Sequence, residues 1–288
     1  MQEQQYEIKK SNSFSLKHIF ECGQCFRWNK EVDGSYTGVV KSNVLNVKED
    51  NRRIVFEGMC EDNIKDLVTS YFNLNTDYEK IKKELAKVDE YLRTSIEFGN
   101  GIRILKQDLW ETLISFIISA NNNIPRIKGI IEKLSKQYGK EIKYNGKSYW
   151  TFPNIEDLSK ASVDDLRKLG LGFRDKRIYE TSKLFLDGRY SVKEIESLED
   201  TKKIRNLLLE LPGVGPKVAD CILLFGLNRF DVFPIDVWVR RVMNELYIKN
   251  EDETKVKKEE IENLAKKKYA GFAGIAQQYL FYWKRETA

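Results

Sequence analysis

A short turn rich in glycine and proline, set between two apolar helical runs, constrains this chain more than any other feature. The turn covers residues 211–217, Leu-Pro-Gly-Val-Gly-Pro-Lys, with apolar-periodic runs at 204–210 and 218–226. Glycine can adopt positive φ and lets a neighbouring backbone approach closely. Pro216 suits the first turn of a helix, where its missing N–H costs nothing. The pattern predicts helix, tight hairpin, helix, with free backbone N–H groups that can bind a phosphate.

Two polar side chains follow this hairpin at positions suited to chemistry. Lys217 ends the hairpin, and Asp236 comes nineteen residues later in Pro234-Ile235-Asp236, where another helix is expected to begin. A lysine amine is a nucleophile only in its neutral form, which apolar surroundings favour. A carboxylate can stabilise a cationic transition state, although Asp236 can also simply cap its own helix. The combination indicates chemistry on a nucleic acid.

These residues resemble a known family signature. Residues 211–217, Val218-Ala219-Asp220-Cys221 and Pro234-Ile235-Asp236-Val237 resemble the helix-hairpin-helix and Gly/Pro-Asp signature of base-excision DNA glycosylases. The lysine resembles that of the bifunctional 8-oxoguanine DNA glycosylase/lyases, and the resemblance spans about residue 20 to the end. It implies that Lys217 attacks the sugar C1′ and forms a Schiff base, while Asp236 stabilises the cationic sugar. The base departs as Lys217 attacks, and the strand is then cut from the Schiff base by β-elimination.

The resemblance also gives the hairpin two contacts with DNA. A phosphate is expected to bind to the backbone of Gly213, Val214 and Gly215. The carbonyls expected to hold a monovalent or divalent cation that bridges to a phosphate are those of Leu209, Leu211 and Val214. The family often has a histidine two residues after the catalytic aspartate. Trp238 stands there in this chain, so the position is expected to bind DNA by an altered contact.

Two further loops resemble those that hold the duplex around a flipped base. Residues 121–126, Asn-Asn-Asn-Ile-Pro-Arg, match the gap-filling loop. Asn121 is therefore expected to enter the duplex and Arg126 to read the opposite cytosine, whose acceptors suit an all-donor side chain. The turn at 169–174 matches one that wedges an aromatic ring beside the estranged base, which assigns Phe173 and Arg174. From the residues alone, both stretches also fit ordinary helix ends and turns.

The expected lesion pocket draws on both ends of the chain. Gly23-Gln24-Cys25-Phe26-Arg27-Trp28 resembles the family stretch whose glycine carbonyl accepts the N7–H that 8-oxoguanine has and guanine lacks. Near the C-terminus, the match gives Gln277 the Watson–Crick edge of the base and Phe281 one of its faces. Cys221 is expected on the other face, with Pro234 and Asp236 also in contact with the base. The pattern alone equally fits a buried helix around Phe281.

No cofactor is expected to be required. Cys22-x2-Cys25, with His18 and Cys60, can be imagined as a zinc site, but the paired ligand sets of such sites are missing. Sister glycosylases carry four C-terminal cysteines for an iron–sulfur cluster. No cysteine follows Cys221, so no such cluster is expected.

Composition agrees with a DNA-binding protein without demanding one. The chain has 288 residues, with 49 Lys+Arg against 44 Asp+Glu and a net charge of +5. Four cysteines at this length do not make a disulfide scaffold. No signal-like or membrane-spanning apolar run is seen, so we expect a cytoplasmic monomer whose partner is duplex DNA containing 8-oxoguanine and not a membrane.

The predicted fold class is α+β. Alternating residues up to about 60 predict an antiparallel meander with one solvated face and a hairpin at Asp33-Gly34. Helical periodicity follows, with no strong strand signal after residue 60. The expected helices cover 64–72, 78–86, 108–120, 125–138, 156–159, 163–169, 174–186, 192–196, 200–210, 236–247, 256–268 and 272–284. We expect an N-terminal domain at 1–100 and an all-helical domain at 101–288.

Two other functions fit parts of the pattern. A lysine-type glycosylase for another oxidised base is disfavoured by Gly23 and by the helix of Gln277 and Phe281, and a panel of lesions would separate the two. A non-catalytic helix-hairpin-helix DNA-binding module is disfavoured by Lys217 with Asp236. Borohydride trapping of a covalent intermediate would distinguish such a module from an enzyme.

Overall fold

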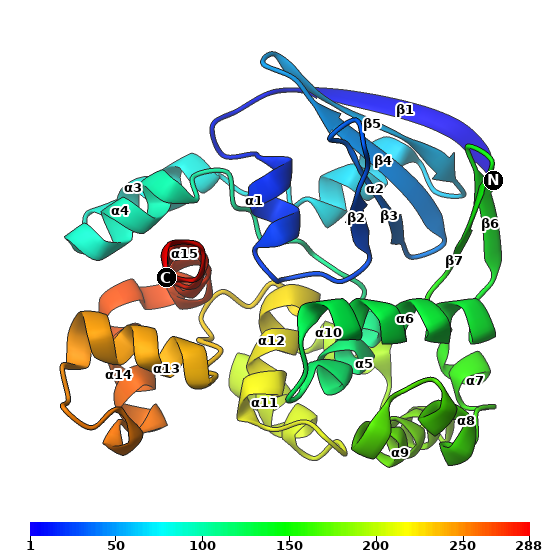
Figure 1. Ribbon diagram of the computed structural model, residues 1–288. Helices are drawn as coiled ribbons and strands as arrows, with labels where there is room; N and C mark the ends of the chain where they lie inside the picture. Colours follow the sequence, from blue (N-terminus) through cyan, green and yellow to red (C-terminus); the bar gives the residue numbers. More distant parts are fainter.

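Alternating apolar residues near the N-terminus form a five-stranded antiparallel sheet in the computed structural model, which describes residues 1–288 (Figure 1). The strand order is β1-β5-β4-β3-β2. The strands are β1 (Gln2–Lys9), β2 (Trp28–Lys30), β3 (Tyr36–Val40), β4 (Asn43–Glu49) and β5 (Arg53–Cys60). The Asp33-Gly34 turn joins β2 to β3, and Gly34 adopts φ +84°. The predicted hairpin is therefore confirmed.

One face of the sheet packs on an aromatic core. The rings of Phe20 and Trp28 stack with centroids 4.2 Å apart, and Phe72 meets Phe56 edge to face at 5.1 Å. Helices α1 (Leu16–Glu21) and α2 (Ile64–Tyr71) supply further buried residues to this core. Burial of these rings anchors the loop at 22–27, which carries Gly23, between the sheet and the helices.

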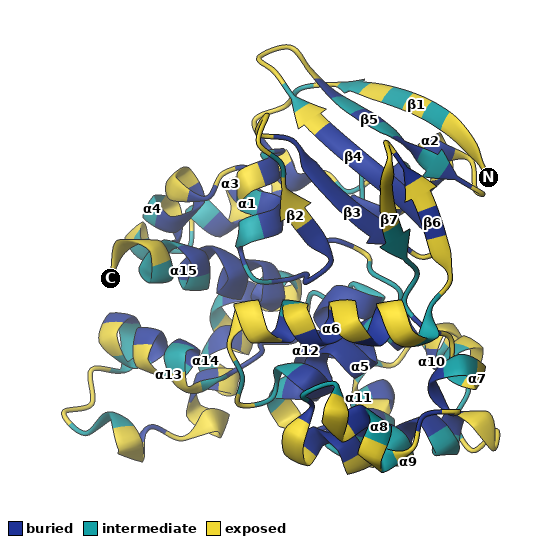
Figure 2. Cartoon of the chain, turned by 45° about the vertical axis from the view of Figure 1, so that its right-hand side comes forward, coloured by how far each residue is buried: buried dark blue, intermediate teal, exposed yellow.

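The opposite face of the sheet is partly covered by a second hairpin, which the sequence analysis missed. Strands β6 (Glu141–Tyr144) and β7 (Lys147–Trp150) rise from the helical part and lean on the sheet (Figures 1 and 2). Ile142 and Tyr144 form a buried cluster with Val39 and Val44. The expectations of no strand after residue 60 and of one solvated sheet face are both wrong here. Asn145 and Gly146 turn the hairpin at φ +48° and +71°, a pattern that favours tight hairpins.

The rest of the chain is mainly helical, as predicted, and the α+β fold class is confirmed. The α-helices are α3 (Tyr78–Ala86), α4 (Glu90–Phe98), α5 (Leu109–Ser119), α6 (Ile124–Tyr138), α7 (Ile155–Leu158), α8 (Val163–Lys168), α9 (Asp175–Leu186), α10 (Val192–Ser197), α11 (Thr201–Leu209), α12 (Pro216–Leu227), α13 (Val237–Met243), α14 (Lys258–Tyr269) and α15 (Ala273–Thr287). Short 3-10 turns are η1 (Gly172–Arg174), η3 (Glu253–Lys255) and η4 (Ala270–Phe272), and a π-helical turn, η2 (Asn244–Ile248), extends α13. The sequence analysis missed α1 and α4.

Helices α3 and α4 pack with the helical core although they come early in the chain. Leu92 and Ile96 belong to the same buried cluster as the residues of α12 and α15, and Phe98 lies 5.6 Å from Tyr282, measured between ring centroids. Figure 1 shows α15 lying between this helix pair and α13 and α14. The expected domain boundary at residue 100 stays a prediction. No helix is both long and apolar enough to span a membrane.

Candidate active site

The hairpin between α11 and α12 is built as its glycines and prolines predict. Pro216 is the first residue of α12, and Gly213 adopts φ +85°. A Cβ at position 213 would stand 2.8 Å from Cδ of Arg177, so only glycine fits without a shift. The N–H of Val214 donates to the carbonyl of Leu211 at 3.1 Å, which closes the turn. Gly215 is exposed, with open space where a side chain would be.

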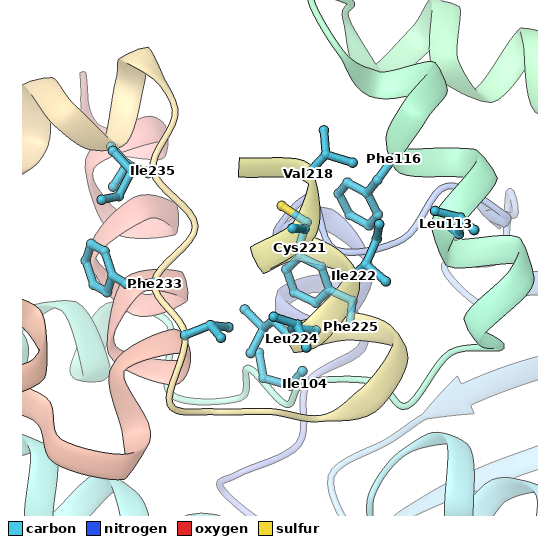
Figure 3. Packing of buried hydrophobic residues seen from close by; sticks show 14 of the residues in the cluster. Ile104, Leu113, Phe116, Val218, Cys221, Ile222, Leu224, Phe225, Phe233 and Ile235 are labelled. Atoms are coloured by element: carbon cyan, nitrogen blue, oxygen red, sulfur yellow. The ribbon is translucent and has the colours of Figure 1, made fainter. Parts of the chain in front are cut away.

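Lys217 lies in the first turn of α12, at the mouth of the apolar core. Its side chain is half-buried, and Nζ lies 5.3 Å from the centre of the Phe116 ring. Cys221 is buried one turn further along, next to Val218 and Phe116 (Figure 3). Burial raises the pKa of the Cys221 thiol to about 11, although the positive charge of Lys217 acts in the opposite direction. The thiol is therefore neutral near pH 7.

Asp236 is the N-cap residue of α13. Its Oδ1 accepts a hydrogen bond from the N–H of Val239 at 2.8 Å, so the predicted capping role is confirmed. The preceding residues Phe233, Pro234 and Ile235 are buried and hold this loop in place. In Figure 3, Phe233 and Ile235 lie on the segment that precedes α13, across from Cys221 on α12. The carboxylate is half-buried and keeps an exposed edge.

A cleft of about 990 Å³ brings these groups together with residues from both ends of the chain. Lys217 and Asp236 line it, and so do Gly23 and Phe281. Its other lining residues are Phe26, Phe116, Ser119, Ala120, Asn121, Asn122, Asn123, Ile124, Pro125, Ile127, Val218, Ile235, Val237, Trp238, Arg240, Lys258 and Arg285. An amine, a carboxylate, a free glycine backbone and an aromatic face thus share one opening of ligand size.

Three residues expected in the lesion pocket lie behind the walls of this cleft. Cys221, Pro234 and Gln277 are buried and do not line it. The side-chain oxygen of Gln277 accepts a hydrogen bond from Nε2 of Gln278 at 2.8 Å. Gly23, Asp236 and Phe281 are the expected pocket residues that line the cleft, and Gly23 adopts φ +89°.

The two predicted duplex loops lie next to each other at one rim of the cleft. Asn121 is exposed at φ +51° after α5, and Asn123 caps α6 through the N–H of Arg126 at 3.0 Å. Arg126 is exposed, and its Nη2 lies 3.3 Å from the carbonyl of Gly170 in the second loop. Phe173 keeps 54% of its surface exposed, which is unusual for a large apolar ring.

Arg174 has a different setting from the one expected. Its side chain is buried, and Nε donates to the carbonyl of Ala120 at 2.9 Å. Nη2 donates to the carbonyl of Asn121 at 2.8 Å, and burial lowers the pKa of the guanidinium. Arg174 therefore holds residues 120–121 through their carbonyls, and its donors are not free for a base. No local sequence signal indicates this setting, because Arg174 and the carbonyls that it bonds are more than 50 residues apart.

The sequence analysis missed several charged residues of the cleft. Arg240, Lys258 and Arg285 all line it, yet each reads in sequence as an ordinary helix-surface charge. Trp238 is half-buried in the same wall, and its indole Nε1 is buried without a hydrogen-bond partner. No cluster of three or more His, Cys, Asp or Glu side chains is arranged to hold a metal ion. The four cysteines are buried and unpaired.

A helix-hairpin-helix whose lysine shares a cleft with the aspartate of the next helix defines the lysine type of base-excision DNA glycosylase. Comparison with known families agrees. The 8-oxoguanine DNA glycosylase N-terminal domain matches residues 6–113, and the HhH-GPD superfamily base excision DNA repair protein matches residues 114–269. The chain belongs to the 8-oxoguanine DNA glycosylase family, a bifunctional glycosylase and DNA lyase class. The family and activity expected from the sequence are thereby confirmed.

Relatives of known name support this assignment along most of the chain. A probable N-glycosylase/DNA lyase of Methanothermobacter thermautotrophicus is 33% identical over 78% of this chain and 76% of its own length. A solved structure of MBOgg1 in complex with a low-affinity DNA ligand is 42% identical, with a TM-score of 0.93 over 100% of this chain and 99% of that one. The Clostridium acetobutylicum 8-oxoguanine glycosylase/lyase, solved with DNA containing cytosine opposite 8-oxoG, is 38% identical with a TM-score of 0.91. That match covers 98% of each chain.

Proposed function

We propose that this chain excises 8-oxoguanine paired with cytosine, using Lys217 as nucleophile, and then cuts the strand at the resulting sugar. One observation carries the proposal: Lys217, Asp236, Gly23 and Phe281 come from four separate segments and line one cleft. The solved relative from Clostridium acetobutylicum holds DNA with that same pair. The chain is proposed to act as a monomer on duplex DNA.

Lys217 carries the covalent step in this proposal. Its Nζ bonds to the sugar C1′ as the N-glycosidic bond breaks, and the bonding electron pair leaves with the base, which is then protonated. Loss of the amine proton and opening of the sugar ring give a Schiff base. Removal of a C2′ proton then expels the 3′ phosphate by β-elimination. The Phe116 ring flanks the amine on one side of the site, with its centre 5.3 Å from Nζ.

Asp236 acts on charge during the same step. As the base leaves, positive charge develops at C1′ and the ring oxygen, and a fixed carboxylate lowers the energy of that state. The bond from Val239 N–H to Oδ1 orients the carboxylate without neutralising it. Its second oxygen makes no hydrogen bond within the protein and can face the sugar or help to move a proton.

Recognition of the lesion is assigned to the cleft wall and the layer behind it. The carbonyl of Gly23 would accept the N7–H of 8-oxoguanine, whereas guanine would set a lone pair against it. Phe281 offers an exposed ring for stacking. Cys221, Pro234 and Gln277 lie behind the wall, so their contacts require the cleft to open further as the base enters.

The opposite strand is assigned to the two loops at the rim. Asn121 fills the gap left by the flipped base, Phe173 wedges beside the estranged partner, and Arg126 reads cytosine. Arg174 reaches this strand only through the segment that it holds, at the carbonyls of residues 120 and 121. This arrangement explains why Phe173 and Arg126 are both exposed to solvent in the free protein.

The hairpin is proposed to grip the backbone of the DNA. The N–H groups of Gly213 and Gly215 make no hydrogen bond within the protein and suit a phosphate, whereas the N–H of Val214 already donates to the carbonyl of Leu211. A cation held by the carbonyls of Leu209, Leu211 and Val214 would neutralise charge between hairpin and phosphate. The Leu211 oxygen already accepts from Val214 and keeps a second lone pair for that purpose. The unpartnered indole N–H of Trp238 takes the place of the histidine contact.

Borohydride trapping on a duplex containing 8-oxoguanine opposite each of the four bases tests the proposal. The parent protein should form a covalent adduct fastest with cytosine. Lys217→Gln should form none while still binding the lesion. Lys258→Gln, which removes the other lysine lining the cleft, should still form the adduct. An adduct at the parental rate with Lys217→Gln would remove this lysine from the mechanism.

A further inference from the structure

The guanidinium of Arg285, on α15, reaches the cleft with two of its three nitrogens already engaged. Nη2 donates to the backbone carbonyl of Glu21, and Nε lies 3.0 Å from a carboxylate oxygen of Glu286. Nη1 is buried and has no hydrogen-bond partner. Because the guanidinium is planar and its donors are fixed, these two bonds determine where Nη1 lies.

Nη1 lies beside two of the pocket residues that line the cleft, Gly23 and Phe281. A Cβ on Gly23 would stand 3.2 Å from it, and the guanidinium carbon is 5.3 Å from the centre of the Phe281 ring. Arg285 lines the same cleft as Lys217 and Asp236. Buried donors without a partner are rare in proteins and call for an explanation. An acceptor on a base that enters the cleft would supply the missing partner.

We propose that Arg285 is a specificity-determining residue whose Nη1 donates to an exocyclic oxygen of the flipped base. The inference rests on the proposed function, in which the Gly23 carbonyl accepts the N7–H of 8-oxoguanine. That base carries O6 and O8 on either side of N7–H, so it presents acceptor, donor, acceptor along one edge. A guanidinium N–H beside a backbone carbonyl is complementary to two neighbouring positions of that edge.

The same side chain joins the two halves of the pocket. Its bond to the Glu21 carbonyl ties the loop that carries Gly23 to the helix that carries Phe281. A lysine at this position would keep the charge but could not bond to Glu21 and to the base at once. Charge alone therefore does not replace the arginine.

The test compares base excision with cleavage of a preformed abasic site, which places no base in the pocket. Arg285→Met and Arg285→Lys should each slow 8-oxoguanine excision by about 10- to 150-fold, the range for losing a hydrogen bond from a charged group. Cleavage of the abasic site should stay within about threefold of the parent rate, because it needs Lys217 but no contact to a base.

Lys284→Met is the matched control. It removes one positive charge from the neighbouring position on α15, where Nζ bonds to Glu245 at 2.6 Å and not to the cleft. Both of its rates should follow the parent at fixed salt.

Binding measurements identify the oxygen. In the inert Lys217→Gln background, Arg285→Met should weaken binding to an 8-oxoguanine duplex. A duplex with 8-oxoadenine keeps O8 but has an amino group in place of O6. If binding to both duplexes weakens, the acceptor is O8, and if only the first weakens, it is O6.

Three results would overturn the inference. These are unchanged excision in both Arg285 variants, an equal loss in excision and in abasic-site cleavage, and full activity in Arg285→Lys together with loss in Arg285→Met. The last would reduce Arg285 to a charge. If the parent protein itself left 8-oxoguanine in place, the proposed function would fail instead, so the two failures are distinguishable.

Discussion

Replacement of Gly23 by alanine tests the most constrained backbone position of the cleft. Gly23 has φ +89°, a region in which an L-residue is disfavoured by about 1–2 kcal/mol. The new methyl group would stand 3.2 Å from Nη1 of Arg285 and 3.8 Å from Cε1 of Phe281. The strain should lower Tm by roughly 2–4 °C for a chain of this size. Because the methyl group displaces Arg285 and turns the carbonyl of residue 23, excision should fall by about tenfold or more.

Gly34 supplies a control with the same backbone conformation. It has φ +84°, and no atom lies within 4 Å of an added Cβ. Gly34→Ala therefore carries the same strain at the tip of a hairpin that does not line the cleft. Thermal melts and single-turnover excision of 8-oxoguanine are measured for both variants. If the two lose similar stability and excise at the same rate, Gly23 does not shape the lesion site and the reasoning is refuted.

Three further changes have defined outcomes. Asp236→Asn keeps the cap of α13, so folding should survive while excision falls 10²-fold or more; a lower Tm with unchanged turnover would instead favour a purely capping role. Arg126→Ala should reduce the preference for cytosine over the other opposite bases by about 5- to 150-fold in single-turnover excision at fixed salt, while 8-oxoguanine is still preferred to guanine. If the excision rates on all four pairings fell by one common factor, Arg126 would be only a phosphate contact. Burial raises the pKa of the Glu111 carboxyl from 4.5 to about 7. Between these two pH values the folded state holds a proton that the unfolded state releases, so stability is lost as the pH rises through this range. Glu111→Gln should therefore match the parent near pH 4.5 and exceed it by up to about 3 kcal/mol at pH 8 in urea unfolding; an equal gain at both pH values would contradict this.

Local signals in the sequence were sufficient to predict most of the helices and the hairpin that carries Lys217. The glycines and Pro216 specify this hairpin, and Asp236 caps the helix that it was expected to cap. The β6–β7 hairpin could also have been predicted, because the turn residues Asn145-Gly146 lie between alternating residues. It was missed because a short polar strand in a helical region gives little periodicity.

The remaining parts of the site depend on contacts between distant segments, which no local pattern encodes. Arg285 and Gly23 meet only because α15 packs beside the loop after α1. The burial of Arg174 follows from the approach of two loops 54 residues apart. An arginine near a helix end is usually a solvated surface charge, so its sequence gives no hint that it will line a cleft or hold a loop.

The packing of α15 on early helices has a consequence for how the protein forms during synthesis. The hydroxyl of Tyr279 bonds to the carbonyl of Ile102, 177 residues earlier in the chain, and Leu92 and Ile96 lie in the same buried cluster. At about 5–20 residues per second, a ribosome needs roughly 10–35 s to make the segment between the two partners. Until then the face of α4 that packs against α15 stays uncovered. The nascent chain therefore carries a helix with an exposed apolar face while the sheet can already be folded. The cleft can form only after α15 has emerged.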